Sequence, residues 1–135
     1  MPALFLRKGG TMTVQEFYEL SLAMVGHTVR SDNAKDYFLG IANSCLAECF
    51  LKENGARKIN GLTPLDQVPI MKDFNETIPF DDVITLMVVA QGCAARLAAE
   101  DENMVMAEYF GALYESGKQR PLMARYVDVG DRDVW

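Results

Sequence analysis

The side chains best suited to chemistry are three cysteines and one histidine: Cys45, Cys49, Cys93 and His27. Zinc prefers thiolate and imidazole ligands, so these four groups would form a metal site if their elements converged. Cys45 and Cys49, however, lie one helical turn apart within an apolar stripe, where a free cysteine behaves as a small hydrophobic side chain. Their spacing also differs from the Cys-x-x-Cys knuckle of zinc sites. We therefore predict buried, unligated thiols, no metal site and no cofactor.

The carboxylates of Glu16 and Glu19 are the second candidate for chemistry. Their Glu-x-x-Glu spacing resembles half of the magnesium-binding motif of all-helical nucleotide pyrophosphohydrolases, but the Glu-x-x-Asp half on a later helix is missing. Both glutamates face away from the apolar stripe of their helix, which is typical of a solvated surface. The sequence also has no nucleophile motif and no Gly-rich phosphate loop. We predict no catalytic residues and no enzymatic activity, with magnesium-dependent nucleotide hydrolysis as the alternative.

The composition is that of one soluble domain. The 135 residues are 50% hydrophobic and 24% charged, which suits a single globular unit. The formal net charge of -6 argues against a surface that neutralises nucleic-acid phosphates. At the start of the chain an apolar run precedes Arg7 and Lys8, the reverse of a secretory signal. The longest apolar stretch, residues 83–99, is shorter than the roughly 20 residues that a bilayer requires. We expect a cytoplasmic chain without a membrane partner.

Hydrophobic periodicity predicts an all-α fold, a small bundle of about four helices in one domain. A capping box of Thr13 and Glu16 begins the first helix, and Gly26 ends it. The second and longest helix begins near residues 31–33 and ends at the Asn-Gly pair of residues 54–55. It spans about 30 Å at 1.5 Å per residue, the depth of a small domain.

The third helix begins at Asp81 or Asp82 and is apolar on nearly every side, which indicates that other elements surround it. A fourth helix follows the acidic turn at residues 100–102 and ends before Pro121. Its expected inner stripe consists of Met106, Tyr109, Phe110 and Leu113. Several large side chains lie off the stripes and need a second partner surface: Leu39, Phe50, Leu51 and Met104.

Residues 55–80 form a long extended insertion between the second and third predicted helices. Pro64, Pro69 and Pro79 exclude a continuous helix there, and residues 67–71 and 75–80 suit short extended pieces of a small hairpin. A connection of this length is uncommon unless it has a role of its own. It also carries more apolar residues than a solvated loop, which indicates a partner-binding surface. The residues expected to bind a partner are Leu65, Ile70 and Phe74.

Two arms complete the predicted domain: an N-terminal arm, residues 1–12, and an extended C-terminal arm, residues 122–135. Pro121 separates the second arm from the last helix, and its apolar and polar residues alternate as in a strand. A lone strand is stable only when it pairs with an edge or lies in a groove. Another subunit is therefore the expected acceptor, with four anchoring side chains: Tyr126, Val127, Val129 and Trp135.

The order of these features resembles the small all-helical head-to-tail connector, or adaptor, proteins of tailed bacteriophages. The likeness covers residues 13–129 and includes the long second helix and the extended segment with Thr63-Pro64-Leu65. It continues through Ile78-Pro79-Phe80-Asp81-Asp82, which leads into an Ala-rich helix, and through Ala94-Ala95-Arg96-Leu97-Ala98-Ala99-Glu100-Asp101. It ends with Ala107-Glu108-Tyr109-Phe110, Tyr114-Glu115 and Tyr126-Val127-Asp128-Val129. The apolar start and the terminal Val134-Trp135 depart from the family pattern.

The resemblance implies a structural virion protein of the phage neck, assembled in the host cytoplasm. Such adaptors form a homo-oligomeric ring, commonly of twelve copies, beneath the portal protein. The ring extends the DNA channel, so DNA is passing cargo, and it offers a platform to a downstream tail or neck protein. Another phage tail-completion or assembly factor is the remaining alternative.

Overall fold

The computed structural model describes residues 10–26 and 31–120 of the chain. Over these residues the protein is all-α, as predicted. The helices are α1 (Val14–Met24), α2 (Ser31–Glu48), α3 (Phe50–Ile59), α4 (Asp82–Ile84), α5 (Ala90–Glu100) and α6 (Met104–Gln119). A π-helical segment, η2 (Thr85–Val89), joins α4 to α5 in one continuous helix. No strand occurs in these two described ranges. The C-terminal arm and residues 1–9 of the N-terminal arm lie outside them.

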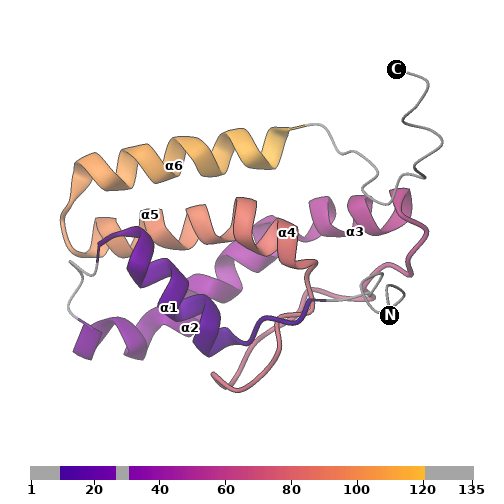
Figure 1. The fold of residues 1–135 in the computed structure, drawn as a ribbon, viewed down its shortest axis with the longest axis horizontal. Coiled ribbons are helices and arrows are strands. Elements are labelled where there is room, and N and C mark those ends of the chain that lie inside the picture. Colours follow the sequence, from indigo (N-terminus) through magenta and orange to yellow (C-terminus); the bar gives the residue numbers. More distant parts are fainter. Residues whose placement is uncertain (1–9, 27–30, 121–135) are drawn as a thin grey trace.

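The centre of the bundle is α5, which packs against α1, α2 and α6. Figure 1 shows α6 lying along the α4–α5 helix on one side, with α1 and α2 on the other. Aromatic side chains connect α1 to α2, since the ring of Tyr18 lies 4.9 Å from that of Phe38. Small buried residues of α5, including Ala90, Gly92 and Ala94, let its neighbours approach closely.

The predicted capping box of α1 is confirmed. The Thr13 hydroxyl accepts from the backbone N–H of Glu16 at 3.1 Å, and the Glu16 carboxylate accepts from the N–H of Thr13 at 2.9 Å. These bonds satisfy two amides that would otherwise lack helical partners. The helix then buries Val14 and Phe17 completely against the bundle.

The predicted second helix is longer than expected and has a discontinuity at Cys49. Backbone hydrogen bonds continue through this residue, with its N–H bonded to Cys45 and its carbonyl to Glu53, both at 3.0 Å. Figure 1 shows α3 continuing from α2. The predicted stop at the first Asn-Gly pair, residues 54–55, is wrong because the second pair ends the helix. There Gly61 adopts a φ of +75°, a left-handed conformation that favours glycine.

The extended insertion between helices is confirmed, but it covers residues 60–81 because residues 55–59 belong to α3. The predicted hairpin of residues 67–71 and 75–80 does not form. Thr77 instead makes an antiparallel bridge with Thr13, and the N–H groups of Val14 and Gln15 bond carbonyls of this segment at 2.9 Å. The backbone of residues 74–78 thus bonds the start of α1 instead of a second strand of a hairpin.

The helix of residues 82–100 is mainly a core helix, with Val89, Cys93 and Leu97 fully buried. By length and composition it could cross a membrane, and 56% of its most apolar window is buried inside the protein. We expected other elements to surround this helix on nearly every side, and in its first turns this prediction is wrong. Three apolar side chains there are exposed: Val83, Leu86 and Met87. On α6, Tyr114 rather than Tyr109 lies inside, because Tyr109 is 61% exposed.

Candidate functional site

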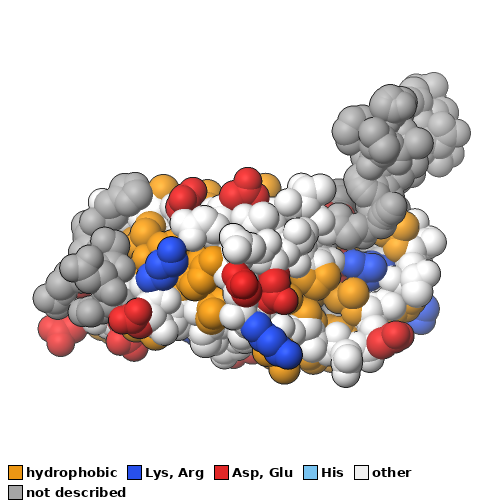
Figure 2. Space-filling model, turned by 90° about the horizontal axis from the view of Figure 1, so that it is seen from below, with side chains coloured by type: hydrophobic (Ala, Val, Ile, Leu, Met, Phe, Trp, Pro, Cys, Tyr) orange, Lys and Arg blue, Asp and Glu red, His pale blue; other side chains and the backbone are white. Residues whose placement is uncertain are grey.

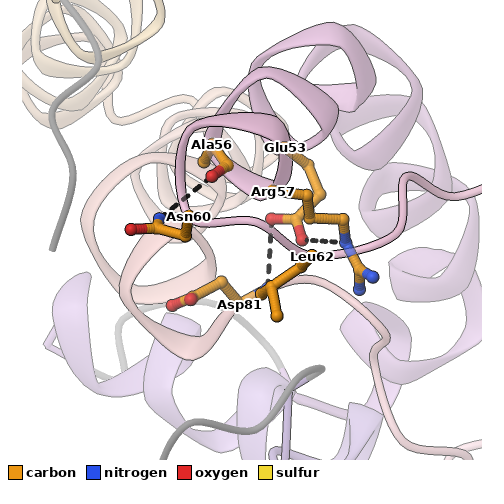
Figure 3. A pocket seen from close by; sticks show the side chains of 6 residues that line it. All are labelled: Glu53, Ala56, Arg57, Asn60, Leu62 and Asp81. Carbon is orange, nitrogen blue, oxygen red and sulfur yellow. Dashed lines mark hydrogen bonds and ion pairs between the residues drawn. The ribbon is translucent and has the colours of Figure 1, made fainter. Parts of the chain in front are cut away.

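The described residues contain two carboxylate centres, which we name the Glu53 centre and the Glu48 centre. In the Glu53 centre, the carboxylate accepts from Arg57 Nε at 2.7 Å and from the backbone N–H of Asp81 at 3.0 Å. Arg57 also donates to the carbonyls of Thr63 and Pro79, at 2.9 and 2.7 Å. Figure 3 shows Glu53 and Arg57 projecting from α3 beside Asp81. The centre therefore holds both ends of the insertion against α3.

The Glu53 centre has no space for a ligand. Its residues line a hollow with Ala56, Asn60 and Leu62, but the hollow has no interior large enough for a water molecule. The Glu53 side chain is 1% exposed and that of Arg57 is 11% exposed. Burial raises the pKa of Glu53, against the opposing effect of Arg57 and of the Asp81 N–H. A buried pair whose hydrogen bonds go to the chain itself is suited to fixing a conformation.

The Glu48 centre joins α2, α5 and α6. The Glu48 carboxylate accepts from the Tyr114 hydroxyl at 2.6 Å and from Arg96 Nη2 at 3.0 Å. Lys118 Nζ lies 3.8 Å from this carboxylate and 4.4 Å from the Tyr114 ring centroid. Partial burial acts to raise the pKa of Glu48, but the bonds from Tyr114 and Arg96 outweigh it and lower this pKa. Glu48 therefore remains ionised, with a guanidinium and a phenol as fixed partners.

The three cysteines lie beneath the Glu48 centre and are buried, as predicted. Arg96 Nη1 lies 3.2 Å from Cys45 Sγ. A hydrogen bond from Cys93, with help from Arg96, lowers the pKa of Cys45, whereas burial raises that of Cys49 to about 11. Among the described residues, no group of three or more His, Cys, Asp or Glu side chains has a metal-binding arrangement. His27 lies outside the described ranges.

Glu16 and Glu19, the candidates for magnesium-dependent nucleotide hydrolysis, make local hydrogen bonds. Glu16 is part of the capping box, and Glu19 accepts from the side-chain amide of Gln15 at 2.9 Å. Both carboxylates are exposed on α1. These bonds stabilise α1 locally.

The predicted partner-binding residues of the insertion have different environments. Ile70 is 64% exposed. Leu65 is half-buried, and its N–H and carbonyl bond the Asn54 side chain at 2.7 and 3.1 Å. Phe74 is also half-buried, with its ring 5.6 Å from that of Tyr18. The structure thus brings Leu65 and Phe74 to the chain's own core and leaves Ile70 on the surface. The other four lie outside the described residues: Tyr126, Val127, Val129 and Trp135.

Two exposed apolar surfaces lie on helices at different ends of the bundle. The α6 surface consists of Met104, Val105 and Tyr109, which are 57%, 81% and 61% exposed. The α3 surface consists of Leu51 and Ile59, which are 81% and 45% exposed and about 12 Å apart along the helix axis at 1.5 Å per residue. Figure 1 shows α6 beginning at the left end and α3 lying at the right end. Of the four off-stripe residues, Leu51 and Met104 are exposed, whereas Leu39 and Phe50 pack against the core.

Sequence reasoning did not identify Val105, Ile59 or the Glu48 centre. A helical projection of residues 104–112 would have placed Val105 opposite the buried Phe110, which is the only available signal for it. The Glu48 centre depends on the packing of three helices, so no local spacing predicts it. Figure 2 shows the underside, where Lys and Arg side chains alternate with Asp and Glu between apolar areas.

Comparisons with known proteins do not place the chain in a family. No model of a protein family, no curated protein and no solved structure matches it.

Proposed function

We propose that this chain is a structural subunit of the head-to-tail connector of a tailed bacteriophage. In this proposal its copies form a ring, commonly of twelve subunits, between the portal protein and a downstream tail or neck protein. DNA passes through the ring as cargo. The protein would act in the neck of the virion after assembly in the host cytoplasm, without catalysing a reaction.

The observation that carries the proposal is the presence of two separate apolar surfaces outside a complete core. Val105 on α6 and Leu51 on α3 are each 81% exposed. Isolated exposed apolar residues are ordinary, but grouped ones on different helices indicate association. A ring requires a head-to-tail contact in which each subunit presents two unlike surfaces. The exposed Ile70 of the insertion adds a contact point that is free to meet the portal or a tail component.

The order of motifs from residue 13 to residue 129 supports the assignment to phage. The all-α fold and the long insertion, which follow that order, are both consistent with it. The acidic net charge of -6 suits a protein through which DNA passes without binding, since like charges repel.

Mass spectrometry of purified virions, with cryo-electron microscopy of the neck, tests the proposal. We expect the protein in the particle, as a ring below the portal. Absence from the particle would favour an assembly factor that departs before completion. Magnesium-dependent hydrolysis of nucleotides by the purified protein would instead favour the enzymatic alternative.

A further inference from the structure

The α6 surface is surrounded by negative charge. Glu100, Glu102 and Glu108 are exposed beside its three apolar residues, and no Lys or Arg occurs between residues 97 and 117. At 100° per residue, Glu108 lies on the same side of α6 as Met104, Val105 and Tyr109. This end of the bundle is therefore apolar at its centre and acidic at its edge.

Three cations lie at the end of the bundle that carries the α3 surface. Lys58 is exposed and lies about 20° from Leu51 in the helical projection, on the side away from Ile59. Lys52 Nζ donates to the backbone carbonyl of Arg120 at 2.7 Å, which brings a second and a third cation to this end. Burial, together with the charge of Arg120, lowers the pKa of Lys52. Glu53 does not neutralise this group because its carboxylate is turned inward to Arg57 and Asp81.

We infer that the α6 surface of one copy of this chain binds the α3 surface of the next copy. The apolar centres are matched in type and the charged edges are opposite in sign, which favours this pairing over α6 with α6 or α3 with α3. The start of α6, which carries the α6 surface, lies at the left end of the bundle, and α3 lies at the right end (Figure 1). The contact is therefore head-to-tail and adds subunits in one direction. The inference rests on the proposed function in that it names the contact between ring subunits.

Two variants that each block one surface test the pairing. Val105→Lys places a cation on the α6 surface, where it would face the cations of the α3 surface. Leu51→Asp places an anion on the α3 surface, where it would face the acidic edge of α6. Both positions are 81% exposed, so both variants should fold, which circular dichroism and thermal unfolding verify. Met87→Lys, at a 55% exposed position outside both surfaces, is the matched control.

Sedimentation velocity over the soluble concentration range provides the measurement. We expect the wild type and Met87→Lys to associate beyond the dimer, more weakly as salt is added. Each blocked variant alone should be monomeric. An equimolar mixture of Val105→Lys and Leu51→Asp should form a one-to-one heterodimer, because one intact α6 surface and one intact α3 surface remain.

Three results would overturn the inference: a wild type that stays monomeric at every concentration, a blocked variant that still associates by itself, or a mixture that stays monomeric. Failure of the proposed function has a different signature. If the mixture forms the heterodimer but the protein is absent from virions, the pairing stands and the connector assignment fails. If the protein is in the neck ring but the mixture stays monomeric, only the pairing fails.

Discussion

The Glu48 and Glu53 centres differ in burial although the two carboxylates are only five positions apart, at the end of α2 and in the first turn of α3. Each accepts a hydrogen bond from an arginine, Arg96 and Arg57 respectively. The Glu53 side chain is 1% exposed, and its pKa is raised. The Glu48 side chain is 39% exposed, and its pKa is lowered. Similar partners are thus associated with opposite pKa shifts. The pKa of Glu53 is raised because its carboxylate has lost more of its contact with water.

This difference implies different roles. A buried ion pair loses much of its attraction to desolvation, so it contributes little net stability, but removing one partner leaves an uncompensated charge. The Glu53 centre therefore selects one position for the insertion. The Glu48 centre keeps contact with water, and its bonds to Tyr114 and Arg96 stabilise the junction of three helices at a smaller desolvation cost.

The largest expected effect comes from Glu53→Ala. The variant leaves Arg57 buried without its partner and the N–H of Asp81 without its acceptor, so we expect a loss of about 3–5 kcal/mol in the free energy of unfolding. Glu48→Ala is the matched control, with an expected loss of about 2 kcal/mol from its hydrogen bonds to Tyr114 and Arg96. Urea unfolding of both variants measures the difference. Equal losses would contradict the distinction between the two centres.

Gly92→Ala disturbs the Glu48 centre through packing alone. A Cβ at this position would lie 2.6 Å from the Tyr114 ring, so the ring must move away from α5. We expect a loss of about 1–3 kcal/mol, as for other overpacked cores. At Gly40, a Cβ meets nothing within 4 Å, so Gly40→Ala should gain roughly 0.5–1 kcal/mol from helix propensity. Thermal unfolding that moves both variants in one direction would contradict this prediction.

Tyr114→Phe removes one bond from the Glu48 centre and keeps the ring. Because the lost hydrogen bond ends on a carboxylate, we expect a loss of about 1.5 kcal/mol. The matched control is Tyr109→Phe on the same helix, where the side chain is 61% exposed and the change should be within about 0.5 kcal/mol. If chemical denaturation gives the two variants the same stability, the phenol does not stabilise the junction.

The smallest effects are those of pH, and they should have opposite signs. The folded-state pKa of Glu48 is lowered, so its contribution to stability is present above the unfolded pKa and is lost as pH falls through the folded one. The folded-state pKa of Glu53 is raised, so wild-type stability falls as pH rises through that value. Relative to Glu48→Gln the wild type should gain stability with rising pH, and relative to Glu53→Gln it should lose stability. Denaturant titrations from about pH 3 to pH 7 measure both differences.

The helices and their starts were predictable because their signals are local. Thr13 and Glu16 are three residues apart, and the Asp81 side chain caps the next helix by accepting from the N–H of Val83. The end of the second predicted helix was not predictable from such signals, because Asn-Gly pairs at residues 54–55 and 60–61 could each end it. The helix continues past the first pair to include Arg57, which donates to the carbonyls of Thr63 and Pro79. Both carbonyls lie beyond the helix. Extension to Ile59 thus follows from tertiary contacts.

The candidate site was less predictable than the fold. Four apolar residues lie off the predicted stripes, and the signal did not distinguish the exposed Leu51 and Met104 from Leu39 and Phe50, which pack against the core. Phe74 looked equally available in the sequence, yet it contacts Tyr18, a residue 56 positions earlier. Apolar content shows that a segment needs a partner, but it does not distinguish a partner in the same chain from one in another subunit.

The bond between Thr11 and Asp82 has a consequence for synthesis on the ribosome. The Thr11 N–H and hydroxyl both bond the Asp82 carboxylate, at 2.9 and 2.6 Å, across 71 positions of the chain. At 5–20 residues per second, Asp82 follows Thr11 by about 4–14 s. The α5 helix, which packs against α1, emerges later still. The apolar side of α1 is therefore without its α5 partner for seconds, and during that time a chaperone that binds nascent apolar segments has access to it.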